Sequence, residues 1–94
     1  MTLYRLHTQD KNRRWIERTI AEQFNGFSIQ KQTGYWIGQK EKSLCIEIMD
    51  NRKSAPVRIQ KIVKAICGYN KQDCILIQQI ELDGFLFSTG NGEL

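Results

Sequence analysis

Residues 27–49 read FSIQKQTGYWIGQKEKSLCIEIM, and this stretch decides the fold. Its two ends, 27–32 and 43–49, alternate apolar with polar side chains, which is the period of a half-buried β-strand. Two glycines, two adjacent aromatic residues and a polar run lie between these ends. The pattern therefore predicts a strand that enters a hairpin and returns as a second strand.

The segments on either side of this hairpin show strand and helix patterns in turn. Residues 11–25 carry apolar side chains at i, i+4 spacing, and Asp10 is placed to cap that helix. Pro56, which is tolerated in a first helical turn, and Gly68, a common helix stop, bound a second helix. The predicted elements are strands over 2–7, 27–32, 43–49 and 74–82, helices over 11–25 and 55–67, and a short fifth strand over 85–87.

The order strand, helix, strand, strand, helix, strand is the split βαβ arrangement. Right-handed crossovers then place both helices on one face of an antiparallel sheet. The sequence therefore predicts an α+β fold, a ferredoxin-like βαββαβ plait with a short extra C-terminal strand, over residues 1–87, with a flexible tail over 88–94. Two helices cover only one face of a sheet, so the other face must be solvated, bind a ligand or pair with another subunit.

The 94 residues suffice for one domain, and their charge is distributed unevenly. Residues 51–72 hold six basic and no acidic side chains, whereas residues 73–94 hold four acidic and no basic ones. With a net charge of +4, this asymmetry favours a partner that is phosphate, an acidic protein or another copy of the chain. No apolar run is long enough for a membrane span and no signal peptide is seen, so we expect a cytoplasmic protein.

The sequence offers little for catalysis or metal binding. One histidine, His7, and three cysteines lack the paired short spacings of a zinc site, and no phosphate-binding loop or dinucleotide fingerprint occurs. Cysteines in apolar surroundings are typical of reduced packing thiols, although a thiol such as Cys45 could face His7 from a neighbouring strand. We therefore expect no enzyme, no metal site and no cofactor.

The main candidate for ligand binding is the hairpin segment, residues 32–43. An aromatic side chain there can stack on a nucleotide base while backbone amides and lysines hold phosphate. The start of the first helix adds two arginines, because helix N-termini and guanidinium groups both attract anions. The alternative is that one aromatic residue packs under the helices, the other caps the sheet edge, and the charges are solvated. The predicted ligand-binding residues are Arg13, Arg14, Tyr35, Trp36, Gly38, Lys40 and Lys42.

A second candidate surface is the basic face of the helix over 55–67. Its cations could imitate or occlude a nucleic-acid-binding surface, or they could form a solvated helix face. The apolar strand over 85–87 is predicted to contact another subunit of a homo-oligomer. Direct binding to duplex nucleic acid is disfavoured, because the acidic last third of the chain leaves few phosphate contacts. The predicted partner-binding residues are Arg58, Lys61, Lys64, Phe85 and Phe87.

Several short motifs in the sequence can be compared with those of other proteins. They are Asp10-Lys11-Asn12-Arg13 and the run from there to Phe24, Gly26-Phe27, Thr33-Gly34-Tyr35-Trp36, Gly38, Glu41-Lys42-Ser43-Leu44 and Glu47. In these motifs the chain resembles small uncharacterised proteins of bacteriophages and other mobile elements. The resemblance implies a compact phage accessory protein, of a kind that often acts without catalysis, by sequestering a nucleotide signal or by blocking a host defence complex.

Two classes of function follow. The first is a non-enzymatic phage-type accessory protein that binds an anionic ligand, most simply a nucleotide or cyclic nucleotide signal of host defence, held between subunits of a small homo-oligomer. The second is a protein–protein inhibitor or adaptor that blocks a host nucleic-acid-binding complex through its basic helix. Neither class involves a membrane. Salt separates direct nucleic-acid binding, which weakens steeply, from binding in a nucleotide pocket, which weakens less.

Overall fold

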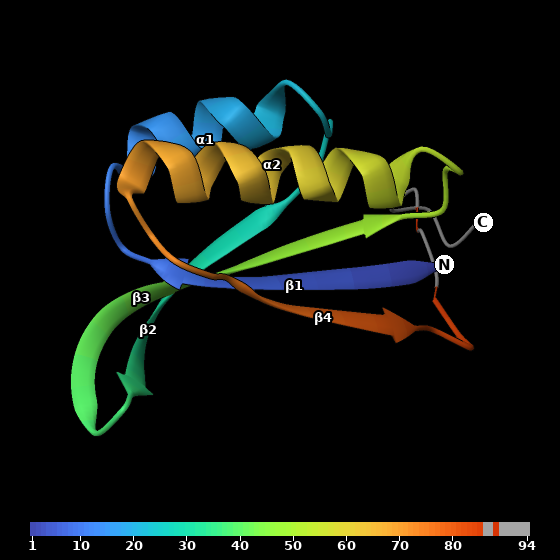
Figure 1. Cartoon of the computed structure of the whole chain (residues 1–94). Helices are drawn as coiled ribbons and strands as arrows, with labels where there is room; N and C mark the ends of the chain where they lie inside the picture. The colour runs from blue at the N-terminus through green and yellow to red at the C-terminus, as the bar shows by residue number, and fades with distance from the viewer. Residues whose placement is uncertain (86–87, 89–94) are drawn as a thin grey trace.

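The computed structural model describes residues 1–85 and Ser88, and it shows an antiparallel sheet of four strands with two helices on one face (Figure 1). The elements are β1 (Thr2–Gln9), α1 (Arg13–Ala21), β2 (Ser28–Trp36), β3 (Gln39–Asp50), α2 (Ala55–Asn70) and β4 (Leu76–Glu81). The strand order is β2-β3-β1-β4, so the units β1-α1-β2 and β3-α2-β4 interlock. This arrangement confirms the predicted ferredoxin-like plait.

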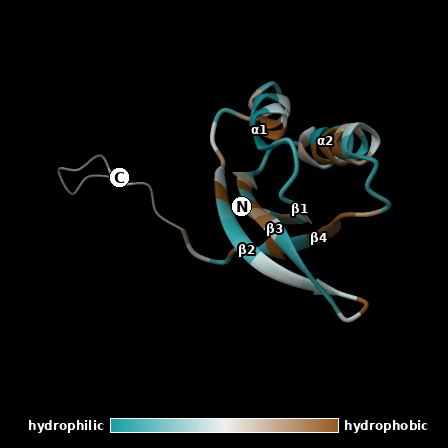
Figure 2. Ribbon diagram, turned by 90° about the vertical axis from the view of Figure 1, so that its left-hand side faces the viewer, coloured by the Kyte–Doolittle hydropathy of each residue, from teal (hydrophilic) through white to brown (hydrophobic). Residues whose placement is uncertain are grey.

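The core fills the space between the sheet and the helices, and Figure 2 shows the two helices lying side by side above the sheet. Side chains of β1 and β3 alternate between the two faces of the sheet, so every second residue points toward the helices. Most of the buried residues are branched aliphatic side chains, each of which stabilises the fold by about 1.5–3 kcal/mol when fully buried. The buried apolar residues are Tyr4, Leu6, Ile16, Ile20, Phe24, Leu44, Ile46, Ile48, Ala55, Ile59, Ile62 and Ile66.

Both helices differ in length from their predicted ranges. Helix α1 starts at Arg13 rather than residue 11, because Asn12, and not Asp10, precedes the first turn, in the left-handed conformation. Helix α2 continues past Gly68 to Asn70. Tertiary contacts hold this last turn in place: the Tyr69 ring stacks on Trp15 at a centroid distance of 4.1 Å, and the Asn70 side chain is buried against the β1–α1 connection.

The central hairpin is longer and tighter than predicted. Strand β2 runs to Trp36 and β3 resumes at Gln39, so the polar residues 39–43 belong to a strand and not to a loop. The turn consists of Ile37 and Gly38, whose φ angles of 50° and 72° suit a two-residue turn of the mirror-image type. Beyond the level at which β1 ends, only β2 and β3 continue, and this two-stranded ribbon curls away below the sheet (Figure 1).

The region after β4 is described only in part. Phe85 lies outside any strand, while residues 86–87 and 89–94, which include most of the predicted fifth strand and of the predicted tail, fall outside the described residues. Among the helices of the described chain, none is long and apolar enough to cross a membrane.

Candidate functional site

The face of the sheet opposite the helices is open, and its side chains form rows across the strands. The register places Met49, Leu3 and Ile80 in one row and Glu47, Arg5 and Gln78 in the next. A further row contains Cys45 of β3, His7 of β1 and Leu76 of β4. By strand alternation and register, this face also carries Ser28, Gln30, Gln32, Cys45, Glu47 and Met49.

The polar side chains of the open face are paired with one another. The Arg5 guanidinium donates to Glu47 at 2.7 Å. His7 bridges two neighbours: its Nδ1 lies 2.9 Å from the Gln32 amide nitrogen, and its Nε2 lies 2.7 Å from the Gln78 amide oxygen. Because the Gln32 nitrogen can only donate, Nδ1 accepts and Nε2 carries the proton. His7 is thus held from both sides, between Gln32 of β2 and Gln78 of β4.

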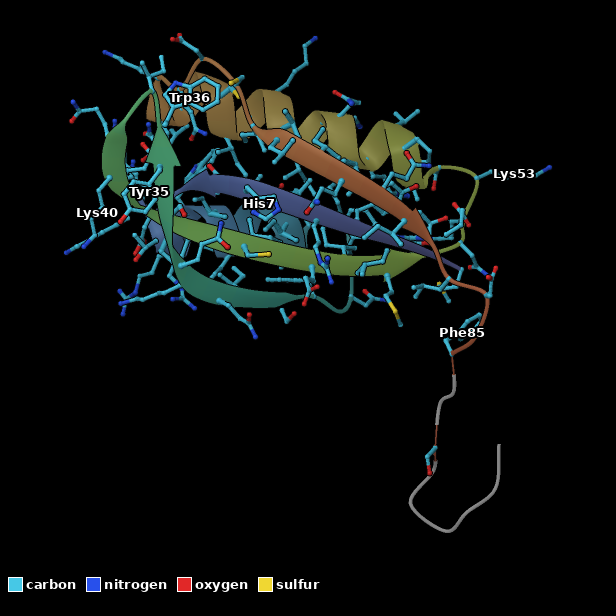
Figure 3. All side chains as sticks on the ribbon, turned by 90° about the horizontal axis from the view of Figure 1, so that it is seen from below. His7, Tyr35, Trp36, Lys40, Lys53 and Phe85 are labelled. Atoms are coloured by element: carbon cyan, nitrogen blue, oxygen red, sulfur yellow. The ribbon has the colours of Figure 1, made fainter. Side chains whose placement is uncertain are left out.

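A groove of about 670 Å³ opens beside His7, between the open face, the curled hairpin and the α2–β4 connection. Figure 3 shows this face from below, with His7 central and with Tyr35 and Trp36 on the hairpin at one end. The residues that line the groove are His7, Thr8, Gln9, Gln32, Gly34, Tyr35, Trp36, Glu41, Ser43, Gln72, Asp73, Cys74, Ile75 and Leu76.

The groove keeps its shape through contacts between distant segments. Gln72 of the α2–β4 connection accepts a hydrogen bond from the Thr8 hydroxyl at 2.8 Å and donates to the carbonyl oxygen of Cys74 at 2.8 Å. At Gly34, a Cβ atom would come within 3.1 Å of the Ser43 hydroxyl oxygen, so the absence of a side chain lets β2 and β3 approach at this point. The floor of the groove is therefore formed before any ligand arrives.

The two aromatic residues of the hairpin are exposed rather than packed in the core. Tyr35 and Trp36 expose 71% and 61% of their surface, so neither lies under the helices. The structure therefore excludes the alternative that one of them is a core residue. Both line the groove, with Trp36 near the start of β4 (Figure 3). Gly38 lies at the turn, where its positive φ is required.

The predicted cations lie elsewhere. None of the described residues that line the groove is lysine or arginine, while Glu41 and Asp73 contribute two carboxylates. Arg13 forms an ion pair with Glu17 one turn along α1, at 3.0 Å, and Arg14 is exposed on the same helix. The structure thus brings the predicted aromatic pair to the groove, but it does not bring the helix arginines there.

The hairpin lysines lie beside the groove without lining it. Lys40 is opposite Tyr35 in the register, and its side chain extends away from the hairpin in Figure 3. Lys42 lines a second hollow of about 490 Å³, together with Lys31, Thr33 and Asp10. By strand alternation Lys42 and Lys31 project from the face of the ribbon opposite to Glu41 and Gln32.

Cys45 lies directly opposite His7 in the register, but its surroundings disfavour a role as a nucleophile. Burial, together with the negative charge of Glu47, raises the pKa of the Cys45 thiol above its usual value. The reactive form of a cysteine is the thiolate, which a raised pKa disfavours. Within residues 1–85, no three His, Cys, Asp or Glu side chains gather in a way that could hold a metal ion.

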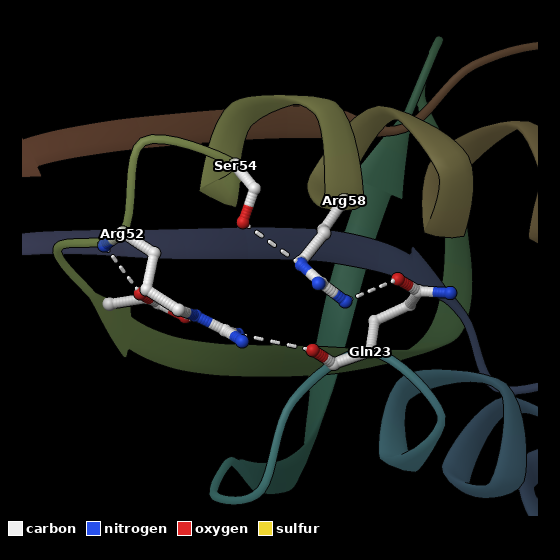
Figure 4. A network of polar contacts seen from close by, with 5 residues as sticks. Gln23, Arg52, Ser54 and Arg58 are labelled. Carbon is white, nitrogen blue, oxygen red and sulfur yellow. Dashed lines mark hydrogen bonds and ion pairs between the residues drawn. The ribbon is translucent and has the colours of Figure 1, made fainter.

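The predicted partner-binding residues have different surroundings. Arg58 is half-buried and donates to the Ser54 hydroxyl at 3.1 Å and to the Gln23 side-chain oxygen at 3.0 Å, which ties α2 to the end of α1 (Figure 4). Lys61 and Lys64 are exposed on α2. Phe85 is 44% exposed, and Phe87 lies outside the part of the chain that is described.

The sequence indicated part of the groove's polar lining and gave no sign of the rest. Strand alternation places His7 and Gln32 on the face away from the helices, and Glu41 and Ser43 belong to the predicted ligand-binding segment, residues 32–43. Gln72 and Asp73 come from a short connection whose sequence has no motif, and they reach the groove only because α2 ends above the last residues of β1.

The fold and the groove define a small open-faced α+β plait. Among solved structures, the chain is similar to a DUF3240 family protein from Shewanella baltica OS155, with a TM-score of 0.72, 17% identity, and coverage of 94% of this chain and 96% of that one. It is also similar to a phage SAM lyase in its apo state, with a TM-score of 0.67, 18% identity, and coverage of 84% and 78%. At these identities the likeness shows the fold alone, and one of the two neighbours is a phage protein. No protein-family model and no curated protein sequence matches the chain.

Proposed function

We propose that the protein binds a nucleotide, linear or cyclic, in the groove below the sheet and sequesters it without chemical conversion. The observation that carries the proposal is the position of Trp36: a largely exposed indole at the rim of a groove whose floor is a fixed polar network. A tryptophan that contributes little to the core and faces a hollow is well placed to stack on a flat ring.

The polar lining suits the edge of a nucleobase. Glutamine side chains offer both donors and acceptors, and Gln32 of β2 and Gln72 of the α2–β4 connection both line the groove. His7 is held by two glutamines and needs no ligand for its own hydrogen bonds. The carboxylates of Glu41 and Asp73 can accept hydrogen bonds from ribose hydroxyls, which is a common role of acidic residues in nucleoside sites.

The phosphate groups leave the groove at the hairpin end. Since no lysine or arginine is among the described lining residues, the anionic part of the ligand extends past the rim, where Lys40 lies opposite Tyr35 in the register. Binding then rests mainly on stacking and base recognition and only weakly on charge. We therefore expect its affinity to depend little on salt, in contrast to binding of a nucleic acid backbone.

The absence of conversion is part of the proposal. Cys45, which lies opposite His7 in the register, has a thiol that is disfavoured as a nucleophile, and both ring nitrogens of His7 are engaged by glutamines. A phage-type protein can remove a host defence signal without catalysis if it binds the signal tightly and is present in excess over it. The likeness in fold to a phage SAM lyase supports the phage setting and does not bear on the absence of conversion, because that neighbour is an enzyme.

The test is isothermal titration of the protein with a panel of nucleosides, mononucleotides, cyclic mononucleotides and cyclic dinucleotides, followed by mass analysis of the recovered ligand. Because stacking on an aromatic residue contributes about 1–3 kcal/mol per base, Trp36→Ala is expected to weaken binding by roughly 5- to 150-fold. The neighbour Ile37, which is more exposed and does not line the groove, provides the control Ile37→Ala, with unchanged affinity. Full binding by Trp36→Ala would overturn the site, and a converted ligand would overturn the non-enzymatic function.

A further inference from the structure

The two edges of the sheet differ in how they are protected against pairing with another strand. The edge strand β2 carries Lys31 and Gly34 and curls away at its end, features that discourage edge-to-edge association. The other edge strand, β4, has the sequence LIQQIE, with no lysine, arginine, proline or glycine. Its first residue, Leu76, is 62% exposed. An unprotected edge with exposed apolar side chains is a template for strand addition.

The backbone of β4 shows which residues are available for such pairing. The Leu82 N–H donates to the Met1 carbonyl oxygen at 2.9 Å, so Leu82 and every second residue before it turn their polar backbone groups toward β1. By the same alternation, Ile77, Gln79 and Glu81 turn theirs outward, where the described chain has no further strand.

We propose that β4 pairs with β4 of a second copy of this chain, antiparallel and about a two-fold axis at Gln78, so that the two sheets become one. In this register, the outward backbone groups of Ile77 and of the partner's Gln79 face each other, as an antiparallel ladder requires. On the open face, Leu76 lies opposite the partner's Ile80, which covers its exposed side chain. Gln78 meets the partner's Gln78 across the axis, and two carboxamides can donate to each other.

The neighbouring register is worse. With the axis at Gln79, Ile77 would lie opposite the partner's Glu81, and Ile80 would lie opposite the partner's Gln78, so each apolar side chain would face a polar one. Registers shifted by a single residue are excluded, because they would bring residues of opposite faces together. The register about Gln78 therefore pairs Leu76 with the partner's Ile80 on the open face, whereas Ile77 and the partner's Gln79 face each other on the helix side.

The helix layer is compatible with this joining. Helix α2 lies above β1 and β4 (Figure 2), and its contacts through Arg58 and Tyr69 face α1. The flank of α2 away from α1 therefore carries Val63 and Cys67, which are uncharged and half-buried. The exposed lysines of α2 lie at other angles around the helix, so two copies can approach along β4 without bringing like charges directly together.

The pairing also brings the second copy close to the groove. Leu76, which pairs with the partner's Ile80, is itself a lining residue of the groove. Continuing the register beyond β4 places the partner's Leu82 opposite Cys74, another lining residue. The association itself does not depend on any ligand, so it can be tested separately from nucleotide binding.

Light scattering after size exclusion, together with native mass spectrometry, tests the pairing on the full chain. We expect the wild-type protein to be a dimer. Gln79→Pro should be a monomer with an unchanged circular dichroism spectrum, because proline removes an outward N–H and leaves the β1–β4 ladder intact. The matched variant Gln79→Thr keeps the N–H and should remain a dimer. A monomeric wild-type protein, or a folded Gln79→Pro that stays dimeric, would overturn the proposal.

Cross-linking tests the register and does not depend on a variant that weakens the dimer. In a chain that also carries Cys74→Ser, Gln78→Cys is expected to form an intermolecular disulfide on mild oxidation, because facing Cα atoms of a non-hydrogen-bonded pair lie about 4.5 Å apart. Gln79→Cys faces the partner's Ile77 and should stay reduced. Cross-linking of Gln79→Cys in place of Gln78→Cys would refute the register.

Discussion

Replacing Ile37 by asparagine is expected to stabilise the protein, because the turn holds a β-branched residue in a conformation that such residues avoid. The φ angle of Ile37 is 50°, in the left-handed region, where an ordinary L-residue costs about 1–2 kcal/mol. Asparagine tolerates this region, and Asn-Gly is the favoured pair for a two-residue hairpin turn. Gly38 already occupies the second position.

The stability lost by removing the apolar Ile37 side chain is small. Ile37 is 85% exposed, so removal of its side chain forfeits only a few tenths of a kcal/mol of burial. The net gain for Ile37→Asn is therefore about 1 kcal/mol, which corresponds to a rise in Tm of roughly 4–8 °C for a domain of this size.

The assay is urea and thermal unfolding followed by circular dichroism, at one fixed protein concentration because self-association would make Tm depend on concentration. Ile37→Val keeps the branched Cβ and should give no gain. An Ile37→Asn protein that is no more stable than wild type, with an unchanged dependence of unfolding on urea, would refute the assignment of strain to this turn.

Two further predictions concern stability. Asn70→Ala should lower the free energy of unfolding in urea by roughly 1–3 kcal/mol, because the buried Asn70 amide accepts from Asn12 at 2.8 Å and donates to the Lys11 carbonyl at 2.9 Å. Gln60→Ala, on the exposed side of α2, is the control, and an equal loss of stability in that variant would contradict the prediction. The hydrogen bond from Arg52 lowers the pKa of the Asp50 carboxyl. The ionised carboxylate therefore stabilises the folded state fully at neutral pH, and this stabilisation is lost as the pH falls below about 4 through the folded-state pKa. When the free energy of unfolding is measured at decreasing pH, Asp50→Asn should therefore lose less stability than wild type. The same pH dependence in both proteins would contradict the role of Asp50.

The alternation of polar and apolar residues determined the architecture from the sequence alone. The side chains of Leu44, Ile46 and Ile48 could only lie on one face of a strand, and the spacing of Ile59, Ile62 and Ile66 could only make one helix stripe. These periods are local properties of the backbone and need no knowledge of neighbours in space. The element order then restricted the topology, because crossovers are right-handed.

Tertiary structure decided where the hairpin ends and what surrounds the groove. The polar residues 39–43 resemble a loop by composition, but they form a strand because they pair with residues 32–36 of β2. Gly68 is a helix stop that contacts of Tyr69 and Asn70 override. The exposure of Trp36, the separation of Lys42 from it, and the meeting of Gln72 with Thr8 depend on which distant segments touch, and no local pattern in the sequence encodes such contacts.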